Sequence, residues 1–172
     1  PLPLLTRWLG RRRSWLLLSQ LLIAAGLVGM AWADPRASLD TIVWAALVVA
    51  FASATQDIAL DAYRIESADA RHQGALAATY QTGYRLAMIW AGAGVLWLAA
   101  RAELGGLAGY QQAAWRAAYL AMAASMAVGV LTVLCSSEPE RRPLPPARGA
   151  RDWLQGALID PFADFLRRYG MQ

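Results

Sequence analysis

Stretches of sequence without any Lys, Arg, His, Asp or Glu decide what this chain can fold into. Three of them cover residues 14–33, 41–56 and 117–137, and a fourth, residues 75–100, is interrupted only by Arg85. A helix of about 20 apolar residues crosses the hydrocarbon core of a bilayer. The sequence therefore predicts an all-α integral membrane chain with four transmembrane helices, at about residues 15–33, 41–63, 74–100 and 116–136.

The overall composition agrees with insertion in lipid. Hydrophobic residues make up 58% of the chain and charged residues 16%, whereas soluble domains carry about 25% charged residues. The net charge of +4 comes from sixteen arginines and no lysine. Because these arginines gather near the ends of the predicted helices, we interpret them as determinants of orientation and not as a surface for nucleic acid. The single cysteine, Cys135, excludes a disulfide framework within the chain.

The arginines are distributed asymmetrically between the loops on the two sides of the membrane. Four lie in residues 1–14, two in the loop after the second helix and six after the fourth helix, whereas the loops on the other side hold three. Positive residues collect on the cytosolic side in short loops. This distribution predicts that residues 1–14 form a cytosolic basic loop and that both ends of the chain are cytosolic.

The sequence also indicates where the helices end and which of their faces pack together. Asp34-Pro35 is expected to end the first helix, and Asp40 is expected to cap the start of the second. Small residues recur at four-residue spacing, as in Ala25 and Gly29, and such faces let membrane helices approach one another closely. We interpret them as packing surfaces.

Residues 138–172 differ in character and are predicted to form a cytosolic linker with amphipathic helices. Prolines at positions 139, 143, 145 and 146 break the helical pattern at its start. Apolar stripes follow in residues 153–158 and 162–169, and Asp160-Pro161 has the pattern of an N-cap followed by a proline in the first turn. We expect two short helices on the inner membrane surface. Packing against another domain is the alternative.

The end of the second predicted helix carries the first candidate functional residues. Gln56 and Asp57 lie there, and Asp57, Asp61 and Arg64 are spaced so that they share one helix face. Asp57 is about 9 Å inside the cytosolic end of the helix. A carboxylate at that depth is paired, solvated in a cavity or protonated. Asp61 and Arg64 lie nearer the interface, where an ion pair that only marks the helix end is an equal alternative.

Arg85 in the third predicted helix is the second candidate. It lies about 16 Å from the cytosolic edge, where an arginine must face the protein interior or water. We expect it to pair with Asp57, with Gln81 and Tyr84 close by, and we assign these residues to a substrate or proton pathway. An arginine that only holds two helices together is the alternative. The sequence contains no cluster of cysteines or histidines that would bind a metal, and it indicates no cofactor.

Four segments resemble the AmpG family of muropeptide permeases, which are major-facilitator transporters. They occur in the family's order and are Gly-Arg-Arg-Arg-x-Trp-Leu-Leu at residues 10–17, Gln-Asp-Ile-x-x-Asp-Ala-Tyr-Arg at 56–64, Gly-Tyr-Arg-Leu at 83–86 and Pro-Phe-x-Asp-Phe-x-Arg-Arg at 161–168. The resemblance extends over nearly the whole chain. It implies that the four helices are helices 3–6 of a twelve-helix fold whose remaining N- and C-terminal parts are the partners of this fragment.

The resemblance also implies a function. The family imports anhydromuropeptides, which are peptidoglycan fragments, across the bacterial inner membrane by symport with protons. Carried over to this sequence, Gln56, Asp57, Asp61 and Arg85 would be the polar residues of the central cavity and would serve proton coupling and transport, with Asp57 as the proton-coupling residue and Arg85 as the partner of the substrate or of a carboxylate. From the residues themselves, we expect Gln81 and Tyr84 to line the substrate cavity together with Gln56. The proton gradient would take the place of a cofactor.

The residues leave three other functions as alternatives. Acetyl-CoA transporters share a similar Gln-Asp segment. CDP-alcohol phosphotransferases bind metal through aspartates that resemble the pair Asp57 and Asp61, but they need a further upstream aspartate pair, which residues 14–33 lack. A four-helix membrane scaffold without transport activity is the third alternative.

Overall fold

The computed structural model describes residues 3–69, 71–103, 109–140, 149 and 154–170. The chain divides into two compact units, Pro1–Glu140 and Arg141–Gln172. Among the described residues there is no strand, which confirms the all-α class. The helices are α1 (Pro3–Leu9), α2 (Arg11–Trp32), α3 (Leu39–Ser67), α4 (Gln73–Ile89), η1 (Trp90–Gly94), α5 (Val95–Ala102), α6 (Gln112–Cys135), η2 (Gln155–Ile159) and α8 (Asp160–Tyr169).

Within the described ranges, four helical segments are long and apolar enough to cross a membrane. They are Arg11–Trp32, Leu39–Ser67, Gln73–Ala102 and Gln112–Cys135. Each begins one to four residues before the start expected from the sequence. The reason is that arginines and other polar residues continue a helix beyond its apolar part while their heads reach water. The predicted loop at residues 1–14 likewise contains a helix, because α1 occupies Pro3–Leu9 and α2 begins at Arg11.

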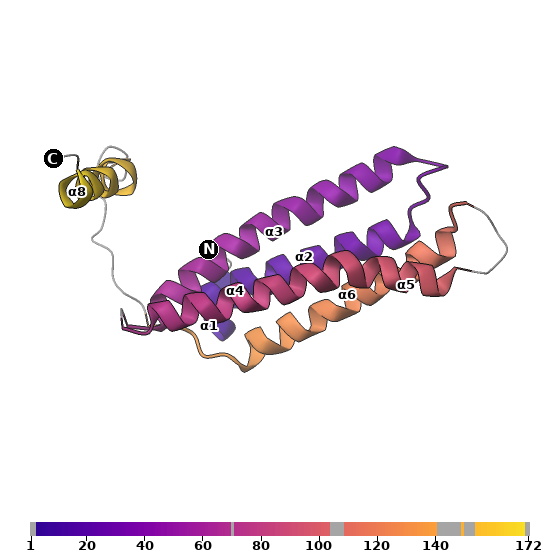
Figure 1. Ribbon diagram of the computed structural model, residues 1–172. Helices are drawn as coiled ribbons and strands as arrows, with labels where there is room; N and C mark the ends of the chain where they lie inside the picture. Colours follow the sequence, from indigo (N-terminus) through magenta and orange to yellow (C-terminus); the bar gives the residue numbers. More distant parts are fainter. Residues whose placement is uncertain (1–2, 70, 104–108, 141–148, 150–153, 171–172) are drawn as a thin grey trace. The chain divides into compact units, whose positions relative to one another are not determined.

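The first unit is built around α2, which packs against both α3 and α6, while α5 packs against α6 (Figure 1). We call the end of the bundle that holds residues 10–13, 64–69, 71–73 and 133–138 the arginine-rich end. The end with residues 32–41, 100–103 and 109–112 is the opposite end. Near the arginine-rich end, Leu16, Ala59 and Val133 form a buried cluster, one from each of the three packed helices. Tyr63 extends this contact, since its hydroxyl donates a hydrogen bond to the carbonyl oxygen of Ser137 at 2.8 Å.

Glycine sets how closely α2 and α3 approach each other. A Cβ atom on Gly26 would lie 2.5 Å from Cγ2 of Val49 and 3.3 Å from the carbonyl oxygen of Ala45. One turn later, a Cβ atom on Gly29 would lie 3.7 Å from that of Ala45, which is an ordinary contact. The predicted packing face therefore exists, but its tightest point is Gly26, a residue outside the expected four-residue pattern.

The third membrane-spanning segment is not a uniform α-helix. Five residues, Trp90–Gly94, form the π-helix η1 between α4 and α5. A Cβ atom on Gly94 would come within 2.6 Å of the Trp90 ring. Glycine thus lets the indole lie against the backbone one turn further along. π-Helical turns are rare and are found mostly as single turns within α-helices.

The expectation that Asp40 caps the start of the second predicted helix is wrong. Asp40 does not cap α3, because the helix begins at Leu39 and Ser38 occupies the N-cap position. Asp34 instead organises the preceding turn: its carboxylate accepts a hydrogen bond from the backbone N–H of Arg36 at 2.9 Å, and its carbonyl oxygen accepts from those of Ala37 and Ser38.

The described residues of the second unit include a helical stretch over residues 155–169, within which the two expected amphipathic segments join. η2 leads directly into α8, and Ile159, which precedes Asp160, is already helical, so Asp160 is not an N-cap. Pro161 has no backbone N–H and cannot complete the hydrogen-bond ladder, which favours a π-helical turn immediately before it. The apolar residues Phe162, Phe165 and Leu166 are exposed, and Arg167 and Arg168 lie in the last turn. Trp153 lies outside the described residues.

Candidate functional site

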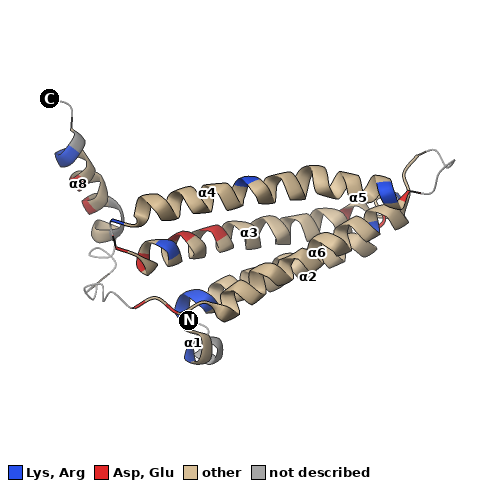
Figure 2. Ribbon diagram, turned by 60° about the horizontal axis from the view of Figure 1, so that its bottom comes forward, with Lys and Arg blue, Asp and Glu red and all other residues tan. Residues whose placement is uncertain are grey.

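Charged residues lie inside α3 and α4 as well as at the ends of the bundle (Figure 2). In α3, Arg64 pairs with Asp61 at 3.2 Å, one turn apart. The same guanidinium lies over the ring of Tyr80 in α4, with 4.9 Å between Cζ and the ring centroid. Arg64 therefore does more than mark a helix end, because it connects α3 to α4.

Tyr80 extends this connection along α4. Its ring stacks on that of Tyr84, with ring centroids 6.4 Å apart. Sequence reasoning gave Tyr80 no role of its own. The i, i+4 spacing of two tyrosines on a predicted helix was the signal that pointed to this stack.

Asp57 and Arg85 do not form the expected ion pair, and neither is paired with any other residue that the structure describes. Both are exposed, as are Gln81 and Tyr84. The reason is geometric: α4 is held to α3 near their connecting loop, where the Gln73 side chain donates to the carbonyl oxygen of Ala68 at 2.9 Å. Further along, α3 and α4 make no extensive packing contact. Asp57 and Arg85 are thus available to water, to a ligand or to another part of the protein.

Two buried polar atoms of this region have no hydrogen-bond partner within the described part of the chain. They are Oε1 of Gln56 and Nε of Arg64, an acceptor and a donor. Buried polar atoms are nearly always satisfied by protein or by water. The two atoms therefore mark positions where a bound water or ligand group would find a partner.

A second polar cluster ties three helices together at the arginine-rich end. Arg12 pairs with Glu66 of α3, with Nη2 2.5 Å from Oε1, and Arg11 adds a contact of 3.2 Å to the same oxygen. Glu138, just after α6, accepts hydrogen bonds from the backbone N–H groups of Arg12 and Arg13 at 2.8 and 3.2 Å. A carboxylate at a helix N-terminus satisfies unpaired N–H groups and complements the helix dipole.

The remaining members of this cluster fix α2 against α6. The Arg13 guanidinium donates to the carbonyl oxygens of Val133 and Leu134, both at 2.8 Å. Gly10 has φ of 88°, and a Cβ atom there would collide with the Glu138 carboxylate. Sequence reasoning interpreted these arginines only as signals of orientation. The acidic residues Glu66 and Glu138, each next to the end of a predicted helix, were the signal for their pairing.

The described residues contain no group of three or more His, Cys, Asp or Glu side chains arranged to hold a metal ion. The polar residues on α3 and α4 are instead carboxylate, amide, phenol and guanidinium groups on membrane-spanning helices. Such groups bind a polar solute by hydrogen bonds and can hold or release a proton. Together with the fold, this arrangement is that of a multi-pass membrane protein with polar and charged groups on its membrane-spanning helices.

The Major Facilitator Superfamily model matches residues 2–169, and the chain therefore belongs to that superfamily. It is 34% identical over 171 residues to the anhydromuropeptide permease of Escherichia coli (strain K12), a match that covers 96% of this chain and 32% of the permease. It is also 34% identical over 168 residues to putative transporter AmpG 4 of Rickettsia felis, covering 97% of this chain and 38% of that protein.

An uncharacterized protein of Haemophilus influenzae is 37% identical over 143 residues, which cover 80% of this chain and 31% of that protein. The resemblance to the AmpG family is thus confirmed. The chain spans about a third of the length of these curated relatives, between 31% and 38%. No solved structure gives a significant match.

Proposed function

We propose that the complete protein is a secondary transporter, and not an enzyme, that imports anhydromuropeptides across the bacterial inner membrane by symport with protons. The observation that carries the proposal is the 34% identity over 96% of this chain to a protein named for that cargo. The polar residues of α3 and α4 supply chemistry that fits it. The rest of the cavity is contributed by parts of the transporter outside these 172 residues.

Each candidate residue has a role suited to its side chain. Asp57 is exposed and unpaired among the described residues, so its carboxylate is free to take up and release a proton, with Asp61 one turn away. Arg85 binds a carboxylate of the muropeptide, because a guanidinium matches a carboxylate in bidentate fashion. Gln56, Gln81 and Tyr84 offer both donors and acceptors, which the hydroxyl and amide groups of a sugar need.

The same residues argue against a coenzyme A ester. Such a substrate carries several phosphates, and recognition of phosphate relies on clustered cationic groups. On this face of α3 and α4 there are two arginines, and Arg64 is already engaged with Asp61 and Tyr80. A ligand with few charges and many hydroxyl groups fits the site better.

Competition in proteoliposomes tests the substrate. With the complete transporter reconstituted and a proton gradient imposed, uptake of a labelled muropeptide is expected to fall when the unlabelled anhydro-disaccharide is added in excess. Acetyl-CoA at the same concentration is expected to leave uptake unchanged. If acetyl-CoA competes and the sugar does not, the substrate assignment is wrong and Arg85 binds phosphate.

Cysteine labelling tests the orientation. Ala37 and Glu103 are exposed at the opposite end of the bundle, and Gly149 belongs to the second unit. Single cysteines at positions 37 and 103, in a background without other cysteines, are expected to react with an impermeant maleimide in intact cells. A cysteine at position 149 is expected to react only after permeabilisation. The reverse pattern would place the arginine-rich end in the periplasm and contradict import in the proposed direction.

A further inference from the structure

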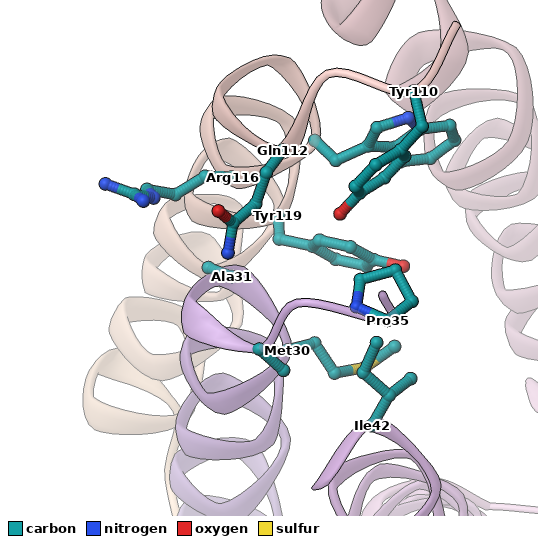
Figure 3. A pocket seen from close by; sticks show the side chains of 10 residues that line it. Met30, Ala31, Pro35, Ile42, Tyr110, Gln112, Arg116 and Tyr119 are labelled. Atoms are coloured by element: carbon teal, nitrogen blue, oxygen red, sulfur yellow. The ribbon is translucent and has the colours of Figure 1, made fainter. Parts of the chain in front are cut away.

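A pocket of about 330 Å³ lies at the opposite end of the bundle, far from Asp57 and Arg85. Residues from the end of α2, the turn that follows it and the start of α3 and α6 line the pocket, and Tyr110 completes it. Three of its lining residues are aromatic: Tyr110, Trp115 and Tyr119. Figure 3 shows Tyr110, Tyr119 and Pro35 facing one another. Nothing in the sequence analysis or in the transport site accounts for this group.

The rings of Tyr110, Trp115 and Tyr119 form what we call the aromatic wall, and neighbouring side chains hold it in place. The Trp115 and Tyr119 rings contact each other, with centroids 6.2 Å apart and planes tilted by 40°. The Arg36 guanidinium lies over the Tyr110 ring, 5.2 Å from its centroid. Arg36 belongs to the turn that the Asp34 side chain organises, so a hydrogen-bonded turn supports the ring. A wall fixed in this way requires little ordering when a ligand binds.

Polar groups sit at the edges of this wall. The hydroxyls of Tyr110 and Tyr119 and the amide of Gln112 can donate and accept hydrogen bonds. Burial raises the pKa of the Tyr110 phenol, and the nearby Asp34 carboxylate raises it further, so the hydroxyl stays protonated. Arg116 lines the pocket as well, but its side chain points away from the rings (Figure 3).

We propose that this pocket binds an uncharged hexose ring of the incoming substrate, as an outer site that the sugar occupies before it reaches Asp57 and Arg85. The C–H face of a hexose packs on an aromatic ring, and its hydroxyls project from the ring edge, where the phenol and amide groups lie. The volume falls in the range of about 300–1,000 Å³ that is usual for small-ligand sites. The inference rests on the proposed function for the identity of the substrate and for the side from which it arrives.

The composition of the pocket favours the sugar over other parts of a muropeptide. A carboxylate would need a cationic group turned toward it, and Arg116 is turned outward. A lipid tail needs no hydroxyl or amide partner, so it would leave Gln112 and the two phenols unpaired against its chain. A ring with apolar faces and a polar edge matches both components of the wall.

Trp115→Leu in the complete transporter is the decisive variant, because it removes an aromatic face and keeps apolar volume. It is expected to raise the KM for muropeptide uptake about fivefold, which corresponds to the loss of one aromatic contact. The maximal rate is expected to stay unchanged. Trp97→Leu is the matched control: Trp97 is an exposed tryptophan of α5 that contacts Arg101 and does not line the pocket. Its KM is expected to equal that of the wild type.

Binding without transport separates this proposal from the proposed function. The anhydro-disaccharide is expected to quench tryptophan fluorescence saturably in the wild type and in Trp97→Leu. In Trp115→Leu the Kd obtained from the quenching curve is expected to be about fivefold higher. Quenching without any muropeptide uptake would refute the proposed substrate and retain the sugar site. Tyr110→Phe keeps the ring, removes one hydroxyl and is expected to raise the KM two- to threefold.

The sugar site is refuted if Trp115→Leu leaves KM and quenching unchanged. It is also refuted if Trp115→Leu lowers folded yield or maximal rate while KM stays at the wild-type value. In that second case the pocket is a packing surface for other helices of the transporter. Folded yield is measured by size-exclusion chromatography in detergent for every variant.

Discussion

Asp57→Asn in the complete transporter is expected to abolish accumulation of muropeptide above its external concentration. Moving one elementary charge across a potential of 100 mV supplies about 2.3 kcal/mol, or about fiftyfold accumulation. An asparagine binds no proton, so the free energy of proton movement no longer drives accumulation. The asparagine amide still fits the space of the carboxylate. The measurement is the ratio of internal to external labelled substrate in energised vesicles.

Asp40→Asn is the matched control for this experiment. Asp40 lies on the same helix as Asp57 but in its first turn, at the opposite end. Its substitution is expected to leave accumulation unchanged. Full accumulation by Asp57→Asn would end the assignment of Asp57 to proton coupling.

Arg85→Gln tests the residue that the sequence led us to expect as the ion-pair partner of Asp57. The single variant is expected to lose uptake, because the substrate carboxylate loses its guanidinium. Since Asp57 and Arg85 form no ion pair in the structure, the double variant Asp57→Asn with Arg85→Gln is expected to transport no better than either single variant. Recovery of both expression and transport in the double variant would instead establish a purely structural pair.

Gly26→Ala is expected to destabilise the complete transporter by roughly 1–3 kcal/mol, the usual cost of overpacking. The added methyl group would meet Cγ2 of Val49 and the carbonyl oxygen of Ala45. Valine is stiff about χ1 within a helix, so the contact is relieved only if α2 and α3 move apart. The measurement is the melting temperature of the purified protein in detergent.

Gly29→Ala is the matched control, because it makes the same glycine-to-alanine change on the same helix. The new Cβ atom would lie 3.7 Å from that of Ala45, an ordinary contact, and alanine is a better helix former than glycine by about 1 kcal/mol. Its melting temperature is expected to equal or exceed that of the wild type. A fall of the same size in both variants would show that glycine matters here for a reason other than the approach of α3.

The sequence predicted the all-α class and the four apolar helices because absence of charge over about 20 residues is a local property. The aspartates and arginines of α3 and α4 stood out for the same reason, since a charge inside an apolar run is visible without a structure. The partners of these charged residues could not be predicted from the sequence. Arg64 reaches Tyr80 and Arg12 reaches Glu66, and both contacts depend on how the helices pack.

The expected pair between Asp57 and Arg85 shows why depth along the membrane is insufficient. Both residues were placed at compatible depths, but depth says nothing about the direction in which a side chain leaves its helix. The aromatic pocket was missed for a related reason. Tyr110, Trp115 and Tyr119 are unremarkable in sequence and line a common pocket only where the turn after α2 comes beside the start of α6.

The π-helix η1 determines which way Arg85 faces. In an unbroken α-helix, each residue turns by about 100°, so Arg85 would leave the helix within about 40° of Ala99. Ala99 is the buried residue of α5, the helix that packs on α6. A π-helical turn takes up one residue more than an α-turn, which changes the angle between Arg85 and Ala99 to about 140°. One additional residue within a glycine-containing turn thus places Arg85 and the buried Ala99 on different sides of this segment, in agreement with the exposure of Arg85.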